Sequence, residues 1–336
     1  MEGERISEVD EAMLAVADSL ATFGSSVIGD RAVKMVTDVA DQQRIPRIDL
    51  TSMIGLYHTA GPQVFDKVLL CSFDGGFTVG LSLTTILTQV GATQEDIVQT
   101  MAKTLRGLLM VYGLSCAMPF CIGEINRVPM GVLTLDGTLV SYKEWSRTAE
   151  KDTLKRLDVA LQLTQMVHEV HQHRVVHLNL RLETVLARKD VEGRLVYLTG
   201  LEYAVPVDEN GLRLRVGALQ PLMRNINGKY ASPELLEGDE KVTPKSDVFQ
   251  LGIMLYELLN KKTLKNYFRH ADAAWVKSMV ADTPYLKGNP AWLETLESSL
   301  NPNPADRPDA SELVTMMERA KAHHYDTINP NKSSTS

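Results

Sequence analysis

The sequence has few cysteines and no long apolar run, and each shortage narrows the possible functions. Its 336 residues include three cysteines, Cys71, Cys116 and Cys121, which match neither a disulfide framework nor a zinc-binding pattern. We expect buried thiols, although Cys116 and Cys121 could form a disulfide if the chain is secreted. The longest apolar run, residues 248–259, contains two polar residues and is too short to cross a bilayer. It therefore predicts a buried helix.

Positive charge is also in short supply. The chain has 35 lysines and arginines against 42 aspartates and glutamates, a formal net charge of -7. This balance gives no electrostatic footprint for nucleic acid. A hydrophobic content of 44% and a charged content of 23% allow one large two-lobed unit or two ordinary domains. Residues 1–5 lack the pattern of a signal peptide, so the chain is either intracellular or begins after a cleavage site.

The order of strand-like and helix-like segments predicts an α+β protein with two lobes. Residues 63–71 and 76–83 are β-branched and aromatic runs separated by glycines, which predict antiparallel hairpins. Residues 93–108 have the capping signal and the apolar spacing of a helix, and the chain is helical in pattern from about residue 150 onwards. A β-rich half followed by an α-rich half is typical of the α+β class.

Five motifs follow one another between residues 157 and 317. Each is weak alone, but their order makes a chance match unlikely. In sequence they resemble the catalytic loop, the D-F-G segment, the A-P-E motif, the D-V-W-S-L-G helix and the late arginine motif of protein kinases, at residues 175–186, 198–204, 230–234, 246–252 and 303–308. This resemblance implies a bilobal protein kinase-like fold, with a β-rich N-lobe and an α-rich C-lobe.

The residues at the chemical positions of these motifs are unusual. Phosphoryl transfer requires a carboxylate base, ligands for magnesium and a lysine on the phosphates. The resemblance places Asn179 at the base, Thr184 and Gly200 at the metal ligands, and Ser82 at the lysine. An amide does not take up a proton at neutral pH, and a positioned base contributes about a hundredfold to ten-thousandfold in rate. We therefore predict a protein that is not an enzyme, a pseudokinase with no catalytic residue.

The region expected to bind nucleotide also lacks the residues that would hold its phosphates. No lysine or arginine lies between Lys67 and Lys103. The glycine-loop-like stretch at residues 55–61 has bulky residues where glycines would approach phosphate. An alternative lysine, Lys34, lies in a stretch that resembles V-A-I-K, but it is too far upstream for an ordinary kinase. We expect no metal, no cofactor and no ATP binding.

Four further positions retain residues that support the fold. Asp247 is expected to accept hydrogen bonds from the catalytic-loop backbone, and Glu234 is expected to pair with Arg307 in a buried setting. Losing one partner of a buried ion pair costs about 3–5 kcal/mol, which is reason to retain it without catalysis. His177 is expected to be a packed core histidine.

This combination of retained structural residues and substituted catalytic residues is similar to the rhoptry-type secreted kinases and pseudokinases of apicomplexan parasites. It is most similar to their bradyzoite pseudokinase branch. The resemblance implies secretion into a parasite vacuole or cyst compartment, with a cytoplasmic location as the alternative. It also implies four parts: an N-terminal helical extension, a degenerate N-lobe, a kinase-like C-lobe and a disordered tail, at residues 1–50, 51–145, 146–324 and 325–336.

The predicted function is a scaffold or allosteric protein-interaction module with an unidentified protein partner, no nucleic acid and no transmembrane segment. A nucleotide-binding pseudokinase, switched by ATP without phosphotransfer, is the alternative. A third possibility is an enzyme with rerouted chemistry that uses Glu202 or Lys34.

Overall fold

The computed structural model shows two compact units. Leu109 and the residues before it, together with Met118–Leu139, form the first, and Met110–Ala117 and Val140–Ser336 form the second. The structure describes residues 41, 44, 47–49, 63–65, 68–73, 77–82, 110–111, 114–116, 121–125, 128–133, 139–141, 153–188, 195–207, 230–237, 243–260, 274–275, 278, 286 and 288–330. Most of the predicted N-terminal extension, including Lys34, lies outside these residues, as do the helix predicted at 93–108 and the glycine-loop-like stretch at 55–61.

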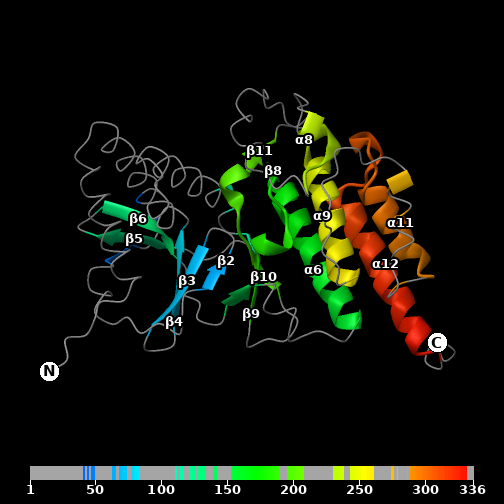
Figure 1. Ribbon diagram of the computed structural model, residues 1–336, viewed down its shortest axis with the longest axis horizontal. Helices are drawn as coiled ribbons and strands as arrows, with labels where there is room; N and C mark the ends of the chain where they lie inside the picture. The colour runs from blue at the N-terminus through cyan, green and yellow to red at the C-terminus, as the bar shows by residue number, and fades with distance from the viewer. Residues whose placement is uncertain are drawn as a thin grey trace. The chain divides into compact units, whose positions relative to one another are not determined.

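The first unit contains two small sheets of three strands each (Figure 1). One sheet is antiparallel throughout and has the order β2-β3-β4, with strands at Gln63–Phe65, Val68–Phe73 and Phe77–Ser82. The β-branched runs predicted as hairpins therefore do pair as antiparallel strands. Ser82, the position expected in place of the lysine, is the last residue of β4, opposite Val68.

The other sheet has the order β1-β5-β6, with strands at Arg47–Asp49, Cys121–Ile125 and Val128–Leu133. The β1 strand runs parallel to β5, so a connection must return the chain between them. The β5 and β6 strands pair antiparallel through a short connection, and their register shifts between Gly123 and Glu124.

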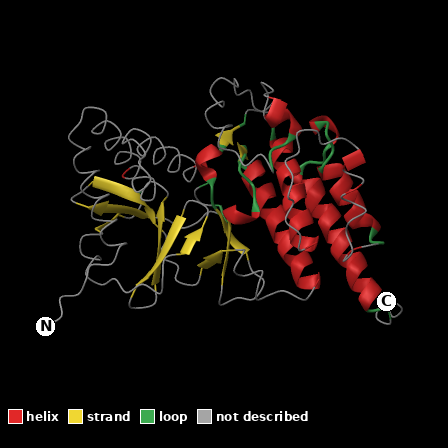
Figure 2. Ribbon diagram, viewed as in Figure 1, coloured by secondary structure: helices red, strands yellow, loops and turns green. Residues whose placement is uncertain are grey.

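Helices dominate the second unit, as Figure 2 shows by colour. They are α6, α8, α9, α11 and α12, at Thr153–Gln172, Pro233–Glu237, Pro244–Asn260, Pro290–Ser299 and Ala310–Ile328. Every residue of α9 from Ser246 to Asn260 is buried, because α6 and α11 pack against it and the strand β8 also contacts it. The apolar run predicted as a buried helix is therefore the central helix of this unit.

A glycine permits one of these helix contacts. A Cβ atom at Gly252 in α9 would lie 2.6 Å from Ser299 Oγ and 3.0 Å from Leu300 Cδ2. Such distances are far inside van der Waals contact, so α9 and the end of α11 approach more closely than alanine would allow.

Short strands connect the helices of the second unit. The strands β9 and β10, at Val185–Arg188 and Leu195–Leu198, form an antiparallel pair, and β7, at Leu139–Ser141, lies on the other side of β9. The strands β8 and β11, at Val175–Val176 and Val205–Pro206, form a second antiparallel pair. These two pairs position the segments between them, residues 177–184 and 199–204.

The last helix, α12, ends later in the sequence than predicted. A capping box starts α12, in which Asp309 and Glu312 satisfy each other's backbone N–H groups. The helix then continues to Ile328, so the predicted disordered tail at residues 325–336 began too early. Asn329 ends the helix by donating its backbone N–H to Tyr325 O at 3.0 Å, and Pro330 cannot continue it. Within the described residues, no helix is both long and apolar enough to span a membrane.

Candidate functional site

The site is centred on the loop between β8 and η4, a single 3₁₀ turn at Leu182–Thr184. Leu178 in this loop has φ +60°, a left-handed conformation that is unfavourable for a leucine. Asp247 of α9 stabilises it, because its two carboxylate oxygens accept the backbone N–H groups of His177 at 2.7 Å and of Leu178 at 2.8 Å. The predicted hydrogen bonds from the loop backbone to Asp247 are present.

A second polar side chain of α9 also holds the loop. Gln250 accepts the backbone N–H of Leu180 at 2.8 Å and donates its amide to Leu178 O at 3.2 Å. Sequence reasoning treated Gln250 only as an interruption of an apolar run. The signal that was available is its position three residues after Asp247, which places both side chains on the same face of the helix.

Asp247 is itself fully buried and has a third partner. His171, near the end of α6, places Nε2 at 2.9 Å from Asp247 Oδ2. A buried carboxylate is stable only when its oxygens are well satisfied, and three donors achieve this. The sequence motifs do not predict the contact with His171.

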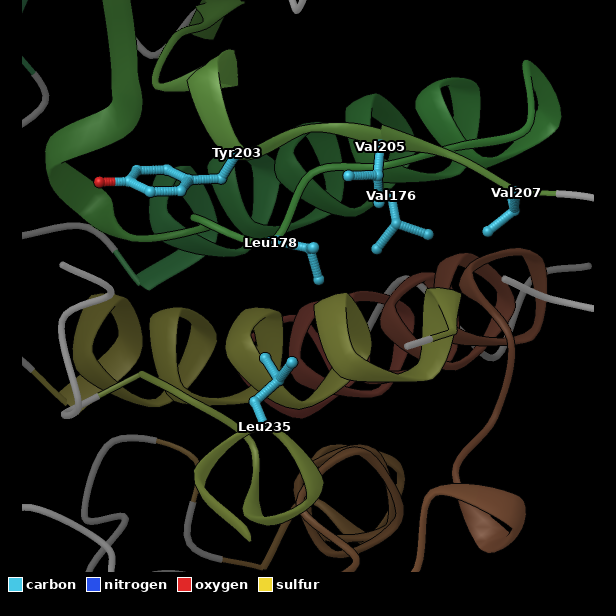
Figure 3. Packing of buried hydrophobic residues seen from close by; sticks show 6 residues of the cluster. All are labelled: Val176, Leu178, Tyr203, Val205, Val207 and Leu235. Carbon is cyan, nitrogen blue, oxygen red and sulfur yellow. The ribbon is translucent and has the colours of Figure 1, made fainter. Parts of the chain in front are cut away.

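Apolar packing supports the same loop from its outer side. Val176, Leu178, Tyr203, Val205, Val207 and Leu235 form one buried cluster. In Figure 3, Leu178 lies between the valines of β8 and β11 on one side and Leu235 of α8 on the other. Leu178 therefore uses its strained backbone to place a side chain in the core, at a position where the kinase-like motif has arginine.

The tautomer of His177 follows from its partners. The ring atom Nδ1 accepts the backbone N–H of Asn179 at 3.2 Å, so it carries no proton. The atom Nε2 lies 3.0 Å from Thr199 O and must donate to that carbonyl. His177 is 1% exposed and neutral in this arrangement. It connects the loop at 177–184 to the segment after β10.

Asn179, Thr184 and Gly200 come together at the centre of the site. The Asn179 amide donates to Gly200 O at 3.1 Å. The Thr184 hydroxyl lies 2.8 Å from Arg181 O and 3.2 Å from Asn179 O. Thr199 donates its backbone N–H to Thr184 O at 2.8 Å. The polar groups of the two segments are therefore bonded to each other.

Gly200 leaves no room for a side chain. It has φ +78°, and a Cβ atom there would lie 2.6 Å from Thr184 Cγ2 and 2.8 Å from Asn179 Nδ2. In the described residues, no three histidine, cysteine or acidic side chains gather as metal ligands. The described side chains nearest Gly200 offer an amide, from Asn179, and a hydroxyl, from Thr184. The side chains of Ser82 and Glu202 lie outside the described residues.

The predicted ion pair between Glu234 and Arg307 is present and buried. The guanidinium donates to both carboxylate oxygens of Glu234 at 2.8 Å, and Ser246 Oγ donates to the same carboxylate at 2.8 Å. Burial opposes ionisation of Glu234, but the hydrogen bonds and charge of Arg307 outweigh it, so the pKa of Glu234 lies below its usual value. Arg307 also lies over the ring of Phe249 at 4.8 Å.

A further anchor lies on the outer part of α6 and was not predicted. The two carboxylate oxygens of Glu169 accept the backbone N–H of Ser115 at 2.7 Å and its hydroxyl at 2.6 Å. The neighbouring Cys116 is a free thiol, and burial raises its pKa to about 12. Cys116 is unbridged in this structure, and the side chain of Cys121 lies outside the described residues.

A family of known proteins matches most of this region. The protein kinase domain matches residues 134–317, more than half of the chain. This match includes the loop at 177–184, the segment at 199–204 and the pair of Glu234 and Arg307.

Three curated relatives from Arabidopsis thaliana show the same similarity. A serine/threonine-protein kinase-like protein is 27% identical over 107 residues, which are 32% of this chain and 28% of the relative. A Wee1-like protein kinase is 24% identical over 156 residues, 46% of this chain and 27% of the relative. Serine/threonine-protein kinase STY46 is 28% identical over 182 residues, 53% of this chain and 29% of the relative. The chain spans less than a third of the length of each.

Proposed function

Because the chain belongs to the protein kinase domain family, we propose that it acts as a kinase-fold interaction module, a scaffold or allosteric partner of other proteins. The observation that supports this proposal is the closed set of hydrogen bonds between the loop at 177–184 and the segment at 199–200. Those bonds hold the centre of the C-lobe in one arrangement, and a rigid fold can present its outer surfaces to a partner without any change at this centre.

One prediction from the sequence must be corrected. The prediction that this chain is not an enzyme is contradicted by the match to the protein kinase domain and by the relatives named as kinases. The prediction depended on the residue types at Asn179, Thr184, Gly200 and Ser82 alone. Membership of a family whose name describes phosphotransfer points to a protein kinase.

The relatives' names therefore favour a second candidate function, phosphotransfer to serine or threonine hydroxyl groups of a protein. In that case the proton of the hydroxyl needs an acceptor and the phosphates need neutralisation. Asn179 and Gly200 would then have to take part in phosphotransfer while their hydrogen bond is intact, or that bond would have to break. The alternative predicted from the sequence is a nucleotide-bound switch. It would bind ATP, unlike the scaffold, but would not transfer phosphate, unlike the kinase.

Two measurements on the purified full chain separate these functions. The first is transfer of radiolabelled phosphate from ATP to generic serine and threonine substrates, with magnesium and with manganese. The second is affinity capture of partners by the full chain and by a variant that retains the fold but is altered on its surface. If the scaffold proposal is right, the full chain captures a defined partner, and the amount captured is the same with and without ATP. Transfer above a mock preparation, or capture that requires ATP, would replace it with the second candidate or the switch.

Three narrower expectations are also proposals. Membership of the rhoptry-type group, a helical extension at residues 1–50 and secretion into a vacuole or cyst compartment are all suggested by the sequence resemblance. Immunolocalisation of the tagged full-length protein in its own cells would test the location. A diffuse cytoplasmic signal would contradict it.

A further inference from the structure

The second unit has two adjoining hollows, apart from the loop at 177–184 and the segment at 199–204. The larger has a volume of about 600 Å³ and is lined by α11, α12, the first turn of α9 and residues 305–308. The smaller has a volume of about 490 Å³ and lies along α11. The two share Glu294, Ser298 and Asp306 in their linings, and both are open to solvent.

Most charged groups in these linings are already engaged within the chain. Lys245 donates to Arg307 O at 2.6 Å, Glu312 accepts the backbone N–H of Asp309 at 2.8 Å, and Asp306 accepts the amide of Asn303 at 2.8 Å. These interactions hold the walls of the larger hollow in place. Each of these groups keeps its charge, because its partner in these bonds is a neutral group.

Three charged side chains remain. Glu294 and Glu297 lie on α11, and Arg319 lies on α12. Among the residues that the structure describes, none of the three has a side-chain hydrogen bond or an ion pair. Glu294 lines both hollows, Glu297 lines the smaller, and Arg319 lines the larger. The joined hollows thus carry two available carboxylates on one helix and one available guanidinium on another.

The apolar part of the linings suits a flexible chain. Met316 and Pro308 contribute to the larger hollow, and Leu293 and Pro290 to the smaller. Methionine adapts to differently shaped side chains. An open surface of this kind does not enclose a small molecule, whereas an extended peptide could lie along it and bury one side chain in each hollow.

We propose that the joined hollows bind a peptide segment of a partner protein that has both a basic and an acidic side chain. The basic side chain pairs with Glu294 and Glu297, and the acidic side chain pairs with Arg319. Charge complementarity carries this choice of occupant: a purely basic segment would meet the unpaired guanidinium, and a purely acidic one would meet two carboxylates. The inference rests on the proposed function, since it names the surface through which an interaction module would bind.

The experiment is a selection of short random peptides displayed on phage, with the full chain as bait. The Glu294→Arg/Glu297→Arg double variant serves for counter-selection. Enriched peptides are expected to contain at least one lysine or arginine and at least one aspartate or glutamate. Synthetic copies, measured by fluorescence anisotropy at physiological ionic strength, should bind the double variant at least about tenfold more weakly.

A charge-pair test shows whether the acidic side chain of the peptide pairs with Arg319. The Arg319→Glu variant should weaken each peptide, and replacing the acidic residue of the peptide with its amide should remove that sensitivity. The matched control is Glu318→Arg, an exposed change on α12 outside both linings, which should leave affinity unchanged.

Peptides that bind the double variant as tightly as the unaltered chain, or enrichment of only one sign of charge, would overturn the inference. So would a selection that enriches nothing. Each of these results leaves the proposed function standing, because partner capture by the full chain tests that function without reference to the hollows.

Discussion

Thr184 and Gly200 are in such close contact that a Cβ atom at position 200 would lie 2.6 Å from Thr184 Cγ2. The two residues come from different segments, one at the end of the loop after β8 and the other two residues after β10. Their contact lies beside the hydrogen bonds that join those segments, and it makes the residue type at each position depend on the other.

The first prediction concerns this contact. Gly200→Ala should lower the free energy of unfolding by about 2–4 kcal/mol, because a non-glycine residue at a positive φ and an overpacked contact each cost about 1–3 kcal/mol. In a Thr184→Ser background, which lacks Cγ2, the same change should cost measurably less. Urea unfolding of the four proteins of this double-mutant cycle gives the coupling. Equal costs in both backgrounds would show that Thr184 does not set the space at position 200.

A second prediction concerns the ion pair of Glu234 and Arg307. Arg307→Met should destabilise the protein by about 3–5 kcal/mol, since it leaves a buried carboxylate without its bidentate partner. The double variant Glu234→Gln/Arg307→Met should lose less than Arg307→Met alone, because no buried charge remains. The midpoints of denaturant unfolding measure both. A double variant less stable than the single variant would contradict the importance of the charge.

Acid should destabilise the protein through particular carboxylates. The pKa values of Glu234, Glu169 and Asp309 lie below their ordinary values of 4.5, 4.5 and 3.8, because hydrogen bonds to each outweigh the cost of burial. A lowered folded pKa means that the stabilisation is complete above the unfolded value and is lost as the pH falls through the folded value. Stability measured by urea unfolding should therefore fall below about pH 4.5, with a shallower fall in Glu169→Gln. An unchanged slope in that variant would exclude Glu169 as a contributor.

ATP should not stabilise the protein. A ligand at a hundredfold its dissociation constant adds about 2.7 kcal/mol to the free energy of unfolding. Nucleotide affinity in kinases depends on cations at the phosphates, and the sequence has none between Lys67 and Lys103. The thermal midpoint should therefore remain the same with millimolar ATP, with or without magnesium or manganese. A shift of several degrees would favour the nucleotide switch, and its loss in Lys34→Ala would identify that lysine as the phosphate ligand.

Replacing the amide at the loop with a carboxylate should not increase phosphotransfer. Asn179→Asp restores only a base, while Gly200 has no room for a metal ligand beside Thr184. It also removes the donor of the hydrogen bond to Gly200 O. The rate of transfer to a generic substrate should equal that of the unaltered chain. A higher rate would show that a carboxylate at position 179 supports the transfer.

The sequence predicted those parts of the site that depend on recognisable spacing. Asp247, Glu234 and Arg307 were identified because each stands in a motif with a fixed structural context, and their contacts follow from it. The contributions of Gln250 and His171 were not predicted, because neither lies at a motif position whose role was assigned. The apolar run at 248–259 placed α9 correctly, since a run of that length is too long for a typical strand and too short for a membrane span. The sequence-based prediction ended the last helix too early, because residues 325–328 are all exposed and add no buried face to the pattern.

The burial of α9 on all sides has a consequence for how this chain changes over generations. A helix with one solvent-facing side can accumulate neutral substitutions there, but between Ser246 and Asn260 this helix has no such side. Any accepted replacement must be matched by a neighbour. At Gly252, whose missing Cβ admits Ser299, a larger residue demands a compensating change in α11. Covariation between those two positions in descendants of this gene would therefore record the packing of the helices, whatever the chain binds.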